Sequence, residues 1–140
     1  GQDEGEYRAL QQFFVLLERF DREVDEIVGH NVLDFDLPFI YQRALVNELR
    51  VPRLVNLSEY NVRGVFDTQR AWWLGQRKTV SLDEIAFALG LKSSKTKEVE
   101  GSTVYDLFHA GRLADIREYN LKDIRLTRQV YERLVSCLGR

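Results

Sequence analysis

Apolar side chains recur every three or four positions between residues 7 and 20, which predicts an amphipathic helix packed on an apolar surface. Glu26–Val28 is then predicted to be the end of a short buried strand. The pattern then returns to helical spacing over Leu37–Arg50, with Asp36 at the predicted N-cap and Pro38 in the first turn. Polar residues therefore lie where a strand gives way to a helix. Open α/β sheets bind their ligands at such crossings.

The second half of the chain repeats this alternation more weakly. Gly64–Thr68 is the next predicted strand. Ser81 and Glu84 form a capping box at the start of a helix predicted over Leu82–Leu89, and Gly90 is expected to end it. A further helix is predicted from residue 102 or 103 to residue 110.

The last predicted helix starts at Arg112 and brings two polar side chains onto one face. Tyr119 and Asp123 are four residues apart, which places them one above the other on a helix. They border an apolar stripe of the same helix. The stripe consists of Leu113, Ile116, Ile124, Val130, Tyr131, Leu134 and Leu138.

Several chemical features have a structural interpretation beside a functional one. Asp36 is explained by local chemistry either as a helix cap or as a functional carboxylate. For Asp67, at the end of the second predicted strand, capping of the following turn is favoured over a place in a site. For the adjacent Trp72 and Trp73, packing is favoured over stacking on nucleic-acid bases. For Lys92, Lys95 and Lys97, a solvated loop is favoured over contact with a phosphate backbone.

Composition narrows the class of protein. The 140 residues, 44% hydrophobic and 30% charged, fit one globular α/β domain over residues 1–140. A net charge of -2 argues against nucleic-acid binding through bulk positive charge. It does not argue against a nuclease, because bound metal ions can supply positive charge locally. The single Cys137 excludes an intramolecular disulfide within this sequence. No apolar run reaches the roughly 20 residues of a membrane span and no signal peptide is visible, so a cytoplasmic protein without membrane contact is expected.

Two spaced sets of residues carry a family resemblance. Asn31-x3-Phe35-Asp36, followed by Leu-Pro-Phe-Ile, resembles the second motif of the DEDD (DnaQ-like, ribonuclease H-like) 3'-to-5' exonucleases. Tyr119-x3-Asp123 resembles the third motif of the tyrosine-bearing (DEDDy) branch. Within that branch, the chain is most similar to predicted exonucleases that resemble the proofreading domain of family B DNA polymerases.

The resemblance implies a ribonuclease H-like fold, in which helices flank a mixed sheet, and hydrolysis of single-stranded DNA from its 3' end. It assigns Asp36 and Asp123 as ligands of a Mg²⁺ or Mn²⁺ pair, for which carboxylates are suited. It makes Tyr119 the group that orients or deprotonates the attacking water. Asn31 and Phe35 would contact the 3' end of the substrate, Phe35 by stacking on a base. RNA stays open as a substrate, because a 2'-hydroxyl contact cannot be inferred from these residues.

The first family motif, Asp-x-Glu on an early strand, has no counterpart here. Only 30 residues precede Asn31, and Asp3, Glu4 and Glu6 have the wrong spacing and lie at a helix start. We therefore expect only the later strands of the sheet, weak metal binding by this chain alone, and exposed apolar surface on the first helix. A companion segment or chain would supply the first motif.

Two alternatives to the exonuclease hypothesis remain. One is a nuclease-derived module that has lost catalysis and binds nucleic acid or a partner protein. The other is that Asp36 and Asp123 are no more than a helix cap and a solvated helix residue.

Overall fold

The computed structural model describes residues 3–52, 57, 62–92 and 113–139. The chain divides into two compact units, Gly1–Asp67 and Thr68–Arg140. Helices and a small parallel sheet confirm the α/β class. The expectation of one domain over residues 1–140 stays a prediction.

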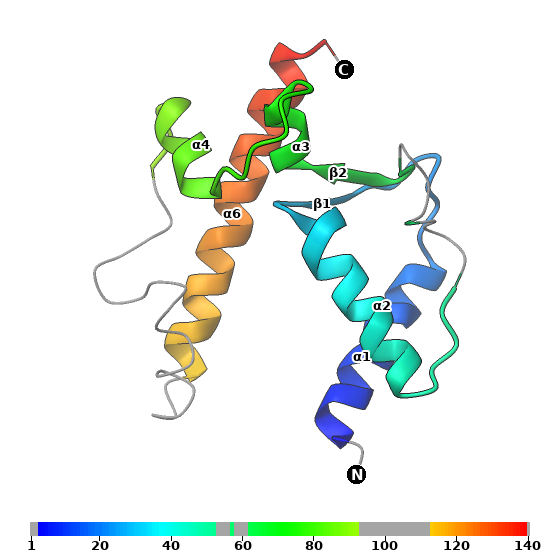
Figure 1. The fold of residues 1–140 in the computed structure, drawn as a ribbon. Coiled ribbons are helices and arrows are strands. Elements are labelled where there is room, and N and C mark those ends of the chain that lie inside the picture. Colours follow the sequence, from blue (N-terminus) through cyan, green and yellow to red (C-terminus); the bar gives the residue numbers. More distant parts are fainter. Residues whose placement is uncertain (1–2, 53–56, 58–61, 93–112, 140) are drawn as a thin grey trace. The chain divides into compact units, whose positions relative to one another are not determined.

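The first unit begins with helix α1 (Glu4–Glu18), coloured blue in Figure 1. Asp3 caps this helix by accepting hydrogen bonds from the backbone N–H groups of Gly5 and Glu6. The predicted apolar stripe is confirmed, because Leu10, Phe14 and Leu17 are buried and form a core cluster with Ala44. The opposite side of α1 exposes Val15 and Leu16, as expected for a helix whose apolar surface is only partly covered.

Strands β1 (Ile27–Gly29) and β2 (Val65–Asp67) pair in parallel, and the connection between them contains the π-helical turn η1 (Val32–Asp36) and helix α2 (Leu37–Val46). The register pairs Gly29 with Asp67, so both strands end at the same edge. Both strands lie where the sequence predicts them. The predicted Leu37–Arg50 helix is four residues too long, because Asn47 caps α2 and Glu48 then takes a left-handed conformation at φ 57°.

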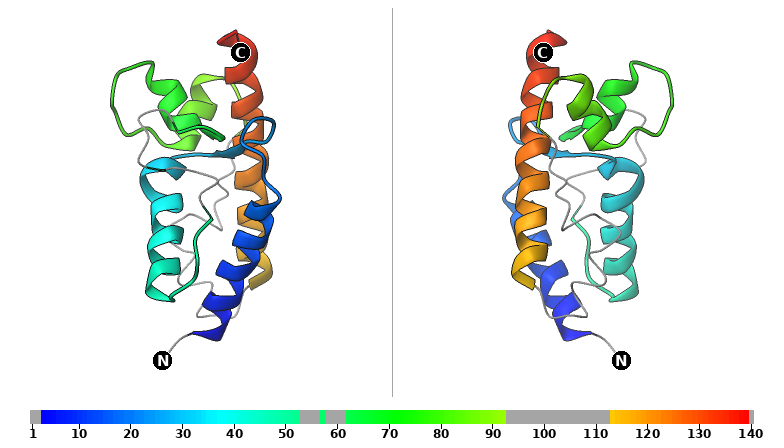
Figure 2. Two further views of the ribbon diagram at one scale, coloured as in Figure 1. Left: turned by 90° about the vertical axis from the view of Figure 1, so that its right-hand side faces the viewer. Right: turned by 90° about the vertical axis from the view of Figure 1, so that its left-hand side faces the viewer.

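The second unit contains α3 (Thr68–Trp73), α4 (Leu82–Ala88) and the long helix α6 (Leu113–Cys137). Figure 2 shows α3 and α4 beside the C-terminal half of α6 in both views. Ile85 of α4 and Val130 of α6 are fully buried. Both hydrogen bonds of the predicted capping box at Ser81 are present, and Gly90 follows the helix at φ 74°.

The apolar stripe of α6 is confirmed in part. Val130 and Leu134 are buried, and Leu126 is buried with them. Ile124 is 63% exposed, and Leu138, which follows the end of α6, is 49% exposed. Ile124 lies on a different side of the helix from Leu126 and Val130, so its apolar side chain is not part of the buried stripe.

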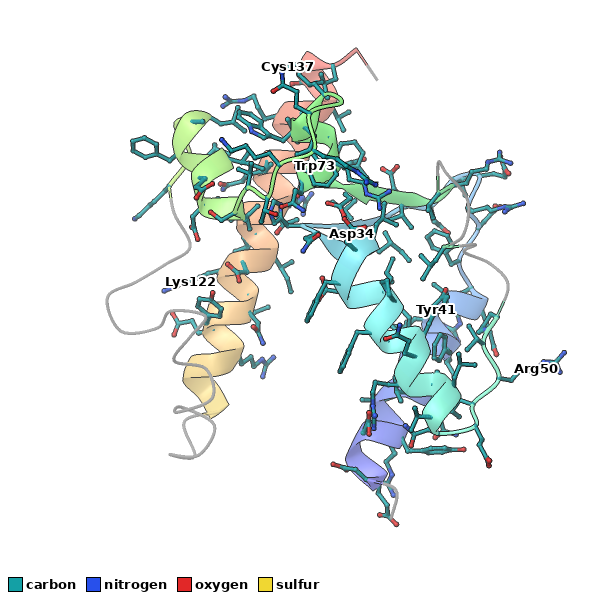
Figure 3. The ribbon with its side chains drawn as sticks, in the orientation of Figure 1. Asp34, Tyr41, Arg50, Trp73, Lys122 and Cys137 are labelled. Carbon is teal, nitrogen blue, oxygen red and sulfur yellow. The ribbon has the colours of Figure 1, made fainter. Side chains whose placement is uncertain are left out.

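Trp72 and Trp73 are both half-buried, and the Trp73 indole donates a hydrogen bond to the carbonyl oxygen of Lys78. Figure 3 shows Trp73 with the side chains around it. The predicted helix from residue 102 or 103 to residue 110 lies outside the described residues, as do Lys95 and Lys97. Among the helices of the described ranges, none is long and apolar enough to cross a membrane.

Candidate functional site

The turn that leaves β1 carries the second-motif residues, and we call residues 29–36 the site turn. Gly29 is buried at the end of β1, where an added Cβ would lie 2.0 Å from Val32 Cγ1. Asn31 then adopts a left-handed conformation, with φ 60° and ψ 26°, which only a few percent of non-glycine residues do and which asparagine tolerates best. Glycine and asparagine thus permit the sharp change of direction from the strand into η1.

Asp36 does not act as the helix cap that local sequence chemistry predicts. Its backbone is already helical, with φ -63° and ψ -49°, and its side chain makes no capping hydrogen bond. The physical reason is η1, whose turn runs directly into α2, so the first amides of α2 are not left at an open helix end. The cap interpretation of Asp36 is wrong, and its carboxylate is not committed to the backbone of α2.

The electrostatic environment of Asp36 disfavours its negative charge. Partial burial of the carboxyl raises the pKa of Asp36 above its ordinary value, and the nearby charge of Asp67 raises it too. A hydrogen bond from its own backbone N–H lowers the pKa of Asp36 and is the second-largest effect after burial, and the charge of His30 lowers this pKa least; the net pKa is raised. A cation beside Asp36 would offset both unfavourable effects.

Asp67 joins β2 to the site turn. Its carboxylate accepts hydrogen bonds from the backbone N–H groups of Asn31, at 2.9 Å, and of Leu33, at 3.1 Å. The residue is 4% exposed. The structural interpretation of Asp67 is therefore supported, but in a different turn. The sequence predicts that Asp67 caps the turn after β2, whereas its carboxylate binds the turn after β1. The sequence could not show this, because the partners are 34 and 36 residues away.

Phe35 forms an exposed aromatic pair with a residue that the sequence did not single out. The rings of Phe35 and Phe39 are parallel to within 2°, with centroids 6.2 Å apart. Phe35 is 62% exposed and Phe39 54% exposed. Their spacing of four residues on a helix could have revealed the pair. Exposed rings of this kind can stack on unpaired bases.

The third motif lies on α6 in the second unit. Tyr119 and Asp123 are both half-buried. The hydroxyl of Thr127 donates a hydrogen bond to the backbone oxygen of Asp123 at 2.7 Å, and Glu118 forms an ion pair with Lys122 at 3.5 Å. The four-residue spacing predicted for Tyr119 and Asp123 is thus confirmed as helical.

The two motifs belong to different units, with Asp36 in the first and Asp123 in the second. That their carboxylates lie within reach of one cation stays a prediction, as do the roles assigned to Asn31, Phe35 and Tyr119. The oxygen donors of Asp36 suit Mg²⁺ or Mn²⁺. Within the described ranges, however, no group of three or more His, Cys, Asp or Glu residues is arranged to hold a metal. Asp36 and Asp123 therefore fit a divalent cation only together with further oxygen ligands.

The acidic residues near the N-terminus have structural partners. Asp3 caps α1, and Glu6 forms a two-point ion pair with Arg43 of α2, in which Arg43 Nη2 lies 2.9 Å from Glu6 Oε2. The hydrogen bond to Arg43 lowers the pKa of Glu6. For Asp3 and Glu6, these contacts agree with the inference that they are not part of the missing first motif.

Comparison with known proteins agrees with the resemblance of the two motifs. The model of a family described as predicted 3'-5' exonucleases related to the exonuclease domain of PolB matches residues 1–140. The DNA polymerase delta catalytic subunit of Caenorhabditis elegans is 30% identical in an alignment of 123 residues that covers 84% of this chain. The match spans about a tenth of that polymerase subunit, 10% of its length. No solved structure gives a significant match. The chain therefore belongs to the family of predicted 3'-5' exonucleases related to the exonuclease domain of family B DNA polymerases.

Proposed function

We propose that this chain carries the later part of a metal-dependent 3'-to-5' exonuclease domain with a ribonuclease H-like fold, and that its substrate is the 3' end of single-stranded DNA. Membership of the exonuclease family supports the reaction. The likeness to a DNA polymerase subunit supports DNA as the substrate. The parallel pair of β1 and β2, with α2 in their connection, is consistent with two later strands of such a fold.

The observation that carries the proposal is the state of the Asp36 carboxylate. It lies on the turn after the carboxyl end of β1, makes no capping hydrogen bond, and has a raised pKa because of partial burial and the charge of Asp67. A residue kept only as a helix cap would have its oxygens on the backbone amides of α2. A carboxylate that remains available beside a second negative charge is better explained as a cation ligand.

In this proposal Asp36 and Asp123 would bind a Mg²⁺ or Mn²⁺ pair together with an Asp-x-Glu motif supplied by a companion segment or chain. Such a pair supplies charge stabilisation to the attacking and leaving oxygens of phosphodiester hydrolysis. Tyr119 would orient or deprotonate the water that attacks the phosphorus. Asn31 would hold the terminal nucleotide, and Phe35 would stack on its base.

The test is degradation of 3'-labelled single-stranded DNA in the presence of Mn²⁺. This chain is compared with a longer version that restores any upstream coding sequence. We expect cleavage by the longer version, and its loss on Asp36→Asn or Asp123→Ala. The matched control is Asp34→Asn, which removes an exposed carboxylate from the same turn and should preserve cleavage. Figure 3 marks Asp34 where the turn meets α2.

Other results would replace the proposal. If neither version cuts DNA and DNA binding survives Asp36→Ala, the chain is a nuclease-derived binding module without catalysis. If an RNA strand of the same sequence is degraded faster than the DNA, the substrate assignment is wrong although the reaction is right. Equal losses on Asp34→Asn and Asp36→Asn would show that Asp36 has no specific role.

A further inference from the structure

Asp67 stands out because its buried carboxylate accepts hydrogen bonds from two backbone amides of a segment more than 30 residues away in the sequence. It ends β2 directly opposite Gly29 in the strand register, and it is 4% exposed. One carboxylate oxygen accepts from the N–H of Asn31 and the other from the N–H of Leu33. The two hydrogen bonds bracket Val32, the first residue of η1.

The conformation of the site turn explains why such a partner is needed. Asn31 is left-handed, at φ 60°, in a turn where the chain leaves the sheet. The amides of Asn31 and Leu33 are part-buried, and buried amides need an acceptor. A carboxylate, with two acceptor oxygens and no donor, can serve both amides at once. In the observed shape of the turn, Asp67 meets this requirement for both amides.

We propose that Asp67 is a positioning residue of the candidate exonuclease site, which acts through the backbone amides of Asn31 and Leu33 to fix the site turn. The side chains on that turn include Phe35 and Asp36, so its shape sets how they are presented. The catalytic consequence of this role rests on the proposed function, whereas the effect on the turn does not.

The substitution that tests this most closely is Asp67→Asn. Asparagine has nearly the same size, but it replaces one acceptor oxygen with an NH₂ group that can only donate. One of the two amides must then lose its partner. The matched control is Leu17→Ala, which weakens the core of the same unit at a residue outside the site turn.

The readout is the NMR spectrum of the whole chain. A residue with positive φ gives a strong intraresidue cross-peak between its amide and Hα protons. In Asp67→Asn we expect this cross-peak of Asn31 to weaken, and the amide signals of Asn31 and Leu33 to move, while signals from the α1 core stay in place. In Leu17→Ala we expect the Asn31 cross-peak to persist. An unchanged Asn31 cross-peak in Asp67→Asn, or equal loss in both variants, would overturn the proposal.

A rescue variant keeps the test decisive if Asp67→Asn folds poorly. Glycine adopts the left-handed conformation without the penalty that a side chain brings. The double variant Asp67→Asn/Asn31→Gly should therefore unfold at a higher temperature than Asp67→Asn alone. No increase in the unfolding temperature would overturn the proposal.

A second arm separates this inference from the proposed function. Mn²⁺ titrated into the longer version of the chain should broaden signals around Asp36, and Asp67→Asn should weaken that binding by about 10- to 100-fold, as is typical for residues that orient metal ligands. If the unsubstituted protein shows no broadening at Asp36, the metal site fails, while the cross-peak of Asn31 still decides the role of Asp67.

Discussion

Replacing Gly29 with alanine is expected to destabilise the first unit through a single collision. The added Cβ would lie 2.0 Å from Cγ1 of Val32, 3.2 Å from its Cβ and 3.3 Å from its Cγ2. Non-bonded carbon atoms normally lie about 3.5–4.0 Å apart. Val32 must therefore move away by roughly 1.5 Å at its Cγ1, or the site turn must shift.

The loss of stability on Gly29→Ala depends on how far Val32 can move. Val32 is β-branched, so few side-chain rotamers are open to it, and it is the first residue of η1. Overpacking of this kind costs about 1–3 kcal/mol. Since about 1.4 kcal/mol is a tenfold change in an equilibrium constant, the unfolding constant should rise about 5- to 150-fold.

A double-mutant cycle with Val32→Ala identifies the collision. That substitution removes both γ-methyl groups and leaves only the contact of 3.2 Å to the Val32 Cβ. Gly29→Ala should therefore cost less in the Val32→Ala background than in the unsubstituted chain, with a coupling of about 0.5–3 kcal/mol. The measurement is urea-induced unfolding followed by circular dichroism. Equal costs in the two backgrounds, or no cost in the unsubstituted chain, would refute the reasoning.

Three further predictions concern charge and helix capping. Because folding raises the pKa of Asp36, ionisation of this carboxyl opposes folding. Asp36→Asn should therefore be more stable than the unsubstituted chain at neutral pH, by less than about 1 kcal/mol because water screens the group. This gain in stability should shrink as the pH falls toward the ordinary pKa of 3.8. An advantage that does not vary with pH in denaturant titrations would contradict this. The hydrogen bond from Arg43 lowers the pKa of Glu6, so Glu6→Gln should lower the free energy of unfolding at neutral pH. This loss of stability should vanish as the pH falls from 4.5 through the lowered pKa of Glu6. A loss of stability that persists in acid would show a different cause. Ser81→Ala removes the capping box of α4 and should lower the free energy of unfolding, measured by thermal unfolding, by about 1 kcal/mol. Amide hydrogen exchange at the start of α4 should become faster, and unchanged exchange there would count against the cap.

Features fixed by neighbouring residues could be predicted from the sequence. The strand at Val65–Asp67 and the capping box at Ser81 depend on residues within a few positions of each other, and both are confirmed. Asp36 shows the limit of such reasoning, because an aspartate before Leu-Pro caps α2 only if its own backbone is extended, and the backbone of Asp36 is helical. A π-helical turn takes that place, and it changes the role available to the side chain.

Features that depend on distant residues could not be predicted. The hydrogen bonds of Asp67 join residues more than 30 positions apart, and the Glu6–Arg43 ion pair spans 37 positions. Nothing in the local pattern at either end marks these pairs. Family resemblance supplies the spacing of the second and third motifs, whereas local chemistry alone explains Asp36 equally well as a helix cap or as a functional carboxylate.

The parallel register of β1 and β2 also limits how the length of this chain can vary. Side chains alternate between the two faces of a sheet, so a slip of β2 by one residue would turn the carboxylate of Asp67 to the opposite face. Insertions or deletions among residues 47–64 need not change the pairing of Gly29 with Asp67. A single residue gained or lost inside either three-residue strand would change it. Among related chains, length differences should therefore fall in that connection and spare both strands.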